Sequence, residues 1–99
     1  MMTQPGHGDY AGQLNTTFRV VETAEFLELE LVEVSDLKTG GGQEYFSLTF
    51  LGDKDKLLPQ KLYALDHETL GQKEIFLVPV RREEDGIKYE AVFNRLTKN

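Results

Sequence analysis

Apolar and polar residues alternate along most of this chain, which is the period of a β-strand with one buried face. The clearest case is the segment 26–34 (FLELELVEV), in which leucines alternate with glutamates. After Leu31 the alternation slips by one residue, and such a slip predicts a β-bulge. Glu and Leu are also good helix formers, but these leucines would spread around a helix, whereas they line up on a strand. We therefore predict a strand here.

Five further segments show strand patterns. Phe46, Leu48 and Phe50 alternate with polar residues, so they are expected to share an inner face. The segment 74–80 (EIFLVPV) is a continuous apolar run, typical of a central strand covered on both faces, with Pro79 near its end or at a bulge. The strands expected besides 26–34 are 18–22, 45–51, 61–66, 74–80 and 87–93.

These elements predict a mainly β fold, either a single small antiparallel barrel or a two-sheet roll of about six strands. One short N-terminal helical turn at residues 10–14 is expected to plug an end of the core. The predicted divisions are a flexible N-terminal lead over 1–9, a single β domain over 10–95 and a frayed C-terminus over 96–99. The triple glycine 40–42 is expected to be a plain loop.

Composition narrows the class of protein further. A chain of 99 residues with 39% hydrophobic residues can close one small core and has little apolar material left for a roomy cavity. The chain has no Cys, which excludes disulfide bonds and thiolate chemistry. No apolar run approaches the ~20 residues of a membrane-spanning helix, so no membrane insertion is expected. No signal peptide is visible, and a cytoplasmic location is the default expectation, although export without such a signal would leave the same sequence.

The charge balance bears on the choice of partner. Eleven bases against 17 acids give a net charge of −6, which opposes binding to nucleic acids and to anionic membrane surfaces. The expected partner is therefore another protein or a second copy of the chain. Six of the acids lie between positions 22 and 36 without a single base among them. They form either a solvated outer face or a docking face for a basic protein patch: Glu22, Glu25, Glu28, Glu30, Glu33 and Asp36.

Polar residues in the loops offer few sites for chemistry. His67 stands beside two acids and could therefore act as a general base. We favour instead a turn in which its ring forms hydrogen bonds with backbone groups. Gln60 and Asn94, near strand ends, are assigned the same turn-structuring role. Asp53 and Asp55 have the spacing that begins a calcium loop, yet its later oxygen ligands are missing. No cofactor or metal is predicted.

Three functions from different classes are consistent with this pattern. The first is a non-catalytic structural or interaction module that docks onto another protein or assembles with itself. The second is a small-ligand barrel, and the third and weakest is an enzyme with a site around His67. The barrel mouth of the second would be lined by aromatic rings: Phe46, Phe50, Tyr63, Phe76 and Tyr89.

Four strings along residues 14–95 resemble a family of short, uncharacterised bacterial β domains: FSLTFLG, LPQKLYALDHETLG, EIFLVPV and DGIKYEAVFN. Members of that family are often encoded beside proteins with phage-tail-collar domains. The resemblance therefore implies a part in a phage-tail-like or cell-surface assembly. It implies no catalytic residues.

Overall fold

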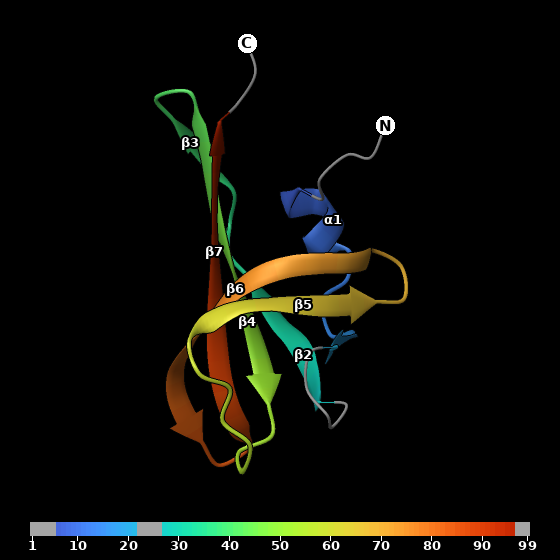
Figure 1. The fold of residues 1–99 in the computed structure, drawn as a ribbon. Coiled ribbons are helices and arrows are strands. Elements are labelled where there is room, and N and C mark those ends of the chain that lie inside the picture. The colour runs from blue at the N-terminus through green and yellow to red at the C-terminus, as the bar shows by residue number, and fades with distance from the viewer. Residues whose placement is uncertain (1–5, 22–26, 97–99) are drawn as a thin grey trace.

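The computed structural model describes residues 6–21 and 27–96, which form one short helix and seven antiparallel strands (Figure 1). Their order along the chain is α1 (His7–Ala11), β1 (Thr17–Val20), β2 (Leu27–Val34), β3 (Lys38–Gly40), β4 (Gln43–Gly52), β5 (Lys61–His67), β6 (Gly71–Glu83) and β7 (Gly86–Leu96).

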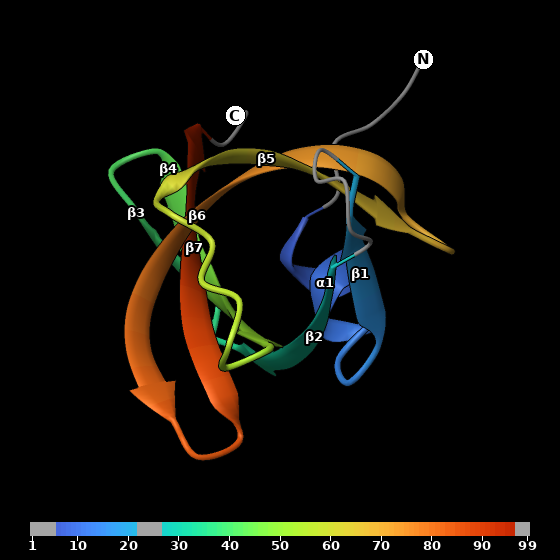
Figure 2. The same ribbon diagram turned by 60° about the horizontal axis from the view of Figure 1, so that its bottom comes forward.

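Six of the strands close into a barrel, which confirms the predicted fold class and selects the barrel over the two-sheet roll. The strands follow one another in the order β2-β1-β5-β6-β7-β4, and a further pairing of β2 with β4 joins the two ends. Figure 2 shows the strands curving around a common centre, and Figure 1 shows α1 at one end of the barrel. Strand β3 lies outside this ring and extends the sheet beyond β4.

The interior of the barrel is filled by the alternate apolar positions of its strands. Phe46, Leu48 and Phe50 are all buried, as predicted for one face of β4. The predicted bulge is also confirmed, because the pairing of β2 with β4 shifts register between Leu31 and Glu33. This shift keeps Val34 packed against the core after the change of phase.

Each end of the barrel has its own cover. At one end α1 inserts Tyr10, whose ring lies 5.3 Å from that of Phe93, measured between centroids. At the other end the segment 53–60 buries Leu58, whose backbone N–H donates a 2.9 Å hydrogen bond to the Tyr89 hydroxyl. The side chains between the two covers form one buried cluster, so the barrel has a packed core.

Strand β6 departs from the prediction. The run 74–80 was expected to be covered on both faces, but Phe76 and Val80 are each 46% exposed. Each strand of a closed barrel has only one face toward the interior. On β6 this face is formed by the alternate residues Ile75 and Leu77. Pro79 lies at a register shift against β7, as predicted.

The N-terminal boundary was also misplaced. The helix begins at His7, inside the segment 1–9 assigned to a flexible lead, and it ends at Ala11, so only its existence was predicted correctly. It starts early because the Asp9 carboxylate accepts a hydrogen bond from the Gly6 N–H, and the His7 ring lies 2.8 Å from the Ser35 carbonyl oxygen. The remainder of that lead, residues 1–5, falls outside the described residues.

Two further boundaries differ from those predicted from the sequence. Leu96 is the last residue of β7 rather than the start of a frayed end, and residues 97–99 lie outside the described part. The triple glycine is part of a hairpin, in which Gly40 ends β3 while Gly41 and Gly42 adopt φ values of 59° and 78°. Positive φ at both turn residues is the geometry of a tight two-residue hairpin turn.

Burial of Tyr10 predicts a loss of stability in alkali. Desolvation, with the Asp9 charge adding to it, raises the pKa of Tyr10 from 10.0 to about 12. The neutral phenol is therefore favoured by the fold, and its contribution is complete below pH 10 and disappears as the pH rises toward 12. By pH 11 the loss is on the order of 1 kcal/mol of unfolding free energy.

Urea unfolding at pH 8.5 and pH 11 measures this loss. The Tyr10→Phe variant, which keeps the ring without the ionisable group, should lose less stability than the parent between these two pH values. Burial also raises the pKa of Tyr89, so a smaller decline should persist in the variant. Equal losses in the two proteins would contradict the assignment to Tyr10.

Candidate functional site

A shallow concavity of about 510 Å³ gathers carboxylates from three parts of the chain. Strand pairing explains why they meet. Glu30 lies opposite Leu51, and Gly52 lies opposite Ile87, so the turns that follow β4 and precede β7 emerge beside the outer face of β2. We call this surface the acidic concavity, and its acidic residues are Glu28, Glu30, Asp53, Asp55, Glu84 and Asp85.

Little positive charge opposes these acids. Lys54 is the single base among the described residues that line the acidic concavity, and Arg19 on β1 lies opposite one of the acids, Glu28. Glu30 has Thr17 and Leu51 as its cross-strand neighbours, so neither adjacent strand places a base beside it. The Asp53 carboxylate accepts a 2.9 Å hydrogen bond from the Asp55 N–H, which orders the loop that presents both side chains. Like charges held together in this way favour a cationic partner.

The predicted acidic face is only partly contained in this surface. Glu28 and Glu30 line it, whereas Glu33 lies beyond the bulge in a separate hollow of about 260 Å³. Asp36 is exposed outside both, and Glu22 and Glu25 lie outside the described residues. The acids at 84 and 85 were not predicted to belong to this face. The Asp85-Gly86 turn was a visible signal, but the register that brings it to β2 was not.

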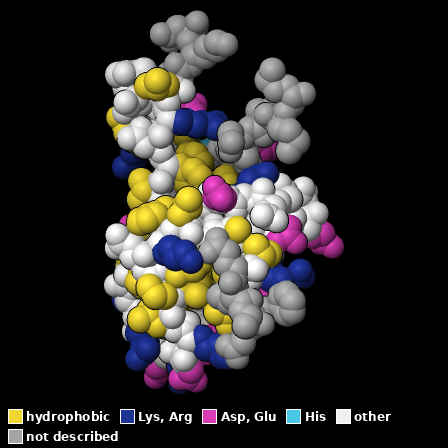
Figure 3. All heavy atoms as spheres, viewed as in Figure 1, with side chains coloured by type: hydrophobic (Ala, Val, Ile, Leu, Met, Phe, Trp, Pro, Cys, Tyr) yellow, Lys and Arg dark blue, Asp and Glu magenta, His cyan; other side chains and the backbone are white. Residues whose placement is uncertain are grey.

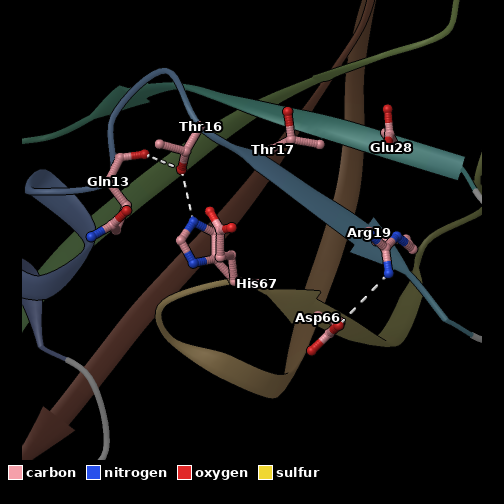
Figure 4. Close-up of a pocket in the computed structure, with 8 residues that line it drawn as sticks. Gln13, Thr16, Thr17, Arg19, Glu28, Asp66 and His67 are labelled. Atoms are coloured by element: carbon pink, nitrogen blue, oxygen red, sulfur yellow. Dashed lines mark hydrogen bonds and ion pairs between the residues drawn. The ribbon is translucent and has the colours of Figure 1, made fainter.

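His67 belongs to a second hollow, of about 370 Å³, between β1, β2 and β5 (Figure 4). The residue is 5% exposed, and its ring lies 4.3 Å from that of Phe18, between centroids. The ring Nδ1 accepts hydrogen bonds from the backbone N–H groups of Thr69 and Leu70, at 3.0 and 3.1 Å. The ring therefore holds the turn between β5 and β6 from within.

The other ring nitrogen completes a directed chain of hydrogen bonds. Nε2 of His67 lies 2.8 Å from Oγ1 of Thr16, and that hydroxyl donates to the Gln13 carbonyl oxygen at 2.6 Å. Because Nδ1 accepts two N–H groups, the proton of the neutral ring is assigned to Nε2, which donates to Thr16. The pair superficially resembles a hydroxyl nucleophile with its base. In this tautomer His67 cannot take the Thr16 proton, because Nε2 already carries one.

The rest of this hollow is polar and charged. Arg19 and Asp66 approach to 3.9 Å across β1 and β5, with both side chains about half exposed. Gln60 and Asn94, which were given the same role as His67, are exposed, and among the described residues no hydrogen bond from either side chain is observed. The structure thus shows turn-structuring contacts for His67 and not for the other two.

The rings proposed for a ligand-binding mouth do not form one. Four of them are buried in the core, while Phe76 points to the outside of the barrel. Within the described residues, no three His, Cys, Asp or Glu side chains converge to hold a metal ion, and Asp53 and Asp55 instead belong to the acidic concavity. No helix in this part of the chain is long and apolar enough to cross a membrane.

Fold and surface together define a small closed antiparallel β-barrel domain with a packed interior and an acidic outer concavity. The chain belongs to the family described as Domain of unknown function (DUF6916), whose model matches residues 5–93. No curated protein and no solved structure matches the chain.

Proposed function

We propose that this domain is a non-catalytic interaction module whose acidic concavity receives a basic segment of another protein. The observation that carries the proposal is the convergence of six carboxylates from three separate segments around one surface, whose described lining contains one lysine. Such a surface steers a cationic partner and holds it by several exposed ion pairs, each contributing about 0.2–1 kcal/mol. The tautomer of His67 supports a non-catalytic role. Because Nδ1 accepts two backbone N–H groups, Nε2 carries the ring proton and cannot act as a base toward the Thr16 hydroxyl.

Binding of a fluorescein-labelled oligolysine peptide tests this role. Fluorescence anisotropy at low ionic strength should show binding by the parent domain that weakens as salt is added. A variant carrying Glu28→Gln, Glu30→Gln and Glu84→Gln should bind roughly tenfold more weakly, because three exposed pairs are lost. All three positions are outside the core, so the fold should be retained.

A matched control separates the site from overall charge. Glu33→Gln, Asp36→Asn and Glu74→Gln remove the same number of charges from exposed or partly exposed positions outside the acidic concavity. This control should lose less than about threefold in affinity, since long-range attraction is screened within a Debye length of ~10 Å. Equal weakening in the two triple variants would overturn the proposal of a localised site.

The biological setting we propose is a phage-tail-like or cell-surface assembly. What supports it is the sequence resemblance to domains that are often encoded beside proteins with phage-tail-collar domains. The check is the order of genes around the one that encodes this chain. If no neighbouring gene encodes a tail or surface component, this proposed setting is contradicted. The proposed role of the acidic concavity does not depend on that result.

A further inference from the structure

A hollow of about 260 Å³ lies on the outer face of the sheet, separate from the acidic concavity. Strand pairing forms its floor, because Thr49 of β4 lies opposite Glu33 of β2 on one side and opposite Glu90 of β7 on the other. These side chains therefore form one row across three neighbouring strands, with the hydroxyl between the two carboxylates. We call this surface the polar hollow, and its lining also includes Ser35, Ser47, Val80 and Arg81.

Two bulges shape the polar hollow. On β6, Val80 and Arg81 are consecutive and yet both line it, although successive side chains of a regular strand point to opposite faces. The register shift between Pro79 and Arg81 makes this arrangement possible. On β2, the shift between Leu31 and Glu33 sets the phase in which Glu33 faces outwards. Bulges recur next to active sites, where they re-aim a side chain.

Four polar side chains of the polar hollow have no partner within the described part of the chain. They are the carboxylates of Glu33 and Glu90 and the hydroxyls of Ser47 and Thr49, and they form no hydrogen bond or ion pair there. Ser35 is instead fixed, since its Oγ accepts a 2.8 Å hydrogen bond from the Ser47 N–H. The polar hollow therefore presents two carboxylates and two hydroxyls, carried by paired strands, to a ligand from solvent.

These groups favour a neutral ligand rich in hydroxyls over a charged one. A phosphate or a carboxylate would face two negative side chains. A cation would meet the Arg81 guanidinium, which lines the same hollow and is oriented by a 2.6 Å hydrogen bond from its Nε to Glu83. Sugar hydroxyls donate strong charge-assisted hydrogen bonds to carboxylates, and Ser and Thr hydroxyls both donate and accept. The net charge of −6 does not oppose such a neutral ligand.

An apolar platform adjoins the polar hollow. Val92 on β7 lies opposite Ser47, and Tyr45 stands two residues before Ser47 on the same face of β4. Val92 is 69% exposed and Tyr45 is 39% exposed, and the Tyr45 hydroxyl donates a 2.6 Å hydrogen bond to Gln43 Oε1. A sugar ring presents C–H groups as well as hydroxyls, so it is bound best where apolar and polar surfaces lie side by side.

The face of β5 and β6 lacks this combination. Figure 3 shows hydrophobic side chains among charged ones on that side of the molecule, and the exposed apolar residues there include Leu62 and Phe76. Neither β5 nor β6 contains a Ser or a Thr. The grouping of free hydroxyls, carboxylates and apolar surface therefore distinguishes the polar hollow from this second exposed face.

We propose that the polar hollow binds a neutral sugar residue of a glycan. Glu33 and Glu90 accept hydrogen bonds from its hydroxyls on either side, and Thr49 bonds to it from the floor between them. A neighbouring sugar of the same glycan lies over Val92 and Tyr45. The inference goes beyond the proposed docking function and uses a different surface, so the two can fail independently.

NMR titration of the full chain, labelled with ¹⁵N, tests this site. The probes are the methyl glycosides of glucose, galactose and N-acetylglucosamine, each added to millimolar concentration. At least one of them should shift the backbone amide signals of residues 47–49 and 90 in a saturable way. Combining Thr49→Val with Glu90→Gln should weaken that binding about tenfold, because a hydroxyl and a charged acceptor for the sugar are both lost.

A matched control makes the same two changes elsewhere. Thr39→Val with Glu74→Gln alters two exposed positions outside the polar hollow and the acidic concavity. It should change the sugar affinity by less than about twofold, since distant sites act independently. Circular dichroism establishes that both double variants are folded.

Two charged sugars test the neutral class of the ligand. Glucuronate should bind more weakly than the glucose probe, because its carboxylate faces Glu33 and Glu90. Glucosamine should gain less than about tenfold over N-acetylglucosamine, since an exposed ion pair contributes no more than ~1 kcal/mol. A larger gain would assign the hollow to cations and overturn the proposal. It is equally overturned if no neutral probe shifts the signals of the hollow, or if the two double variants weaken binding alike.

Discussion

The Gly86→Ala variant should lose more than about 3 kcal/mol of unfolding free energy, a large part of the stability of a small domain. Gly86 has a φ of 148°, which residues with a Cβ rarely adopt. A Cβ at this position would also overlap the backbone oxygen of Gly52 and come within 2.9 Å of Leu51 Cδ1. The Gly52 oxygen cannot yield readily, because the end of β4 is fixed in its ladder with β7.

Gly71→Ala is the matched control for this prediction. Gly71 also has a positive φ, of 78°, but a Cβ there meets nothing within 4 Å. Its substitution should therefore cost only about 1 kcal/mol, the strain of the backbone angle. Urea unfolding followed by circular dichroism measures both, since the chain has no Trp. If Gly86→Ala does not fold while Gly71→Ala does, the prediction holds; similar losses would contradict the close approach of the two turns.

That close approach also forms the acidic concavity, which sequence alone could not provide. Glu28 and Glu30 were identified from their alternation with leucines, because alternation is a local property. Glu84 and Asp85 lie more than fifty residues further along the chain, and only the register of β4 with β2 and β7 brings them beside the first pair. Local patterns determine which face of a strand is exposed. They do not determine which strands become neighbours.

The same distinction explains the error on β6. A continuous apolar run is what a strand covered on both faces requires, so the run 74–80 favoured that position. In a closed barrel every strand has an outer face, and Phe76 and Val80 remain on it. The bulge after Leu31 was predictable for the opposite reason. A bulge changes the phase of the residues around it and so leaves a mark in the local sequence.

His67 was recognised as a turn residue, but its partner Thr16 was not, because 51 positions separate them. The hydrogen bonds of the two ring nitrogens make different predictions for two amide substitutions. The side-chain oxygen of Asn can replace the accepting Nδ1, while the side-chain nitrogen of Gln can replace the donating Nε2. The role of each nitrogen can therefore be measured separately.

His67→Gln should be the more damaging change, with a loss of about 2–3 kcal/mol, because the part-buried N–H groups of Thr69 and Leu70 both lose their acceptor, at ~1 kcal/mol or somewhat more each. His67→Asn keeps that acceptor and loses the bond to Thr16 and part of the packing on Phe18, so about 1–2 kcal/mol is expected. Urea unfolding at neutral pH compares them, with Thr16→Val as the control for the Nε2 bond alone. A Gln variant as stable as the Asn variant would show that Nδ1 does not hold the turn. The assignment of the ring proton to Nε2, which prevents His67 from acting as a base toward Thr16, would then have no support.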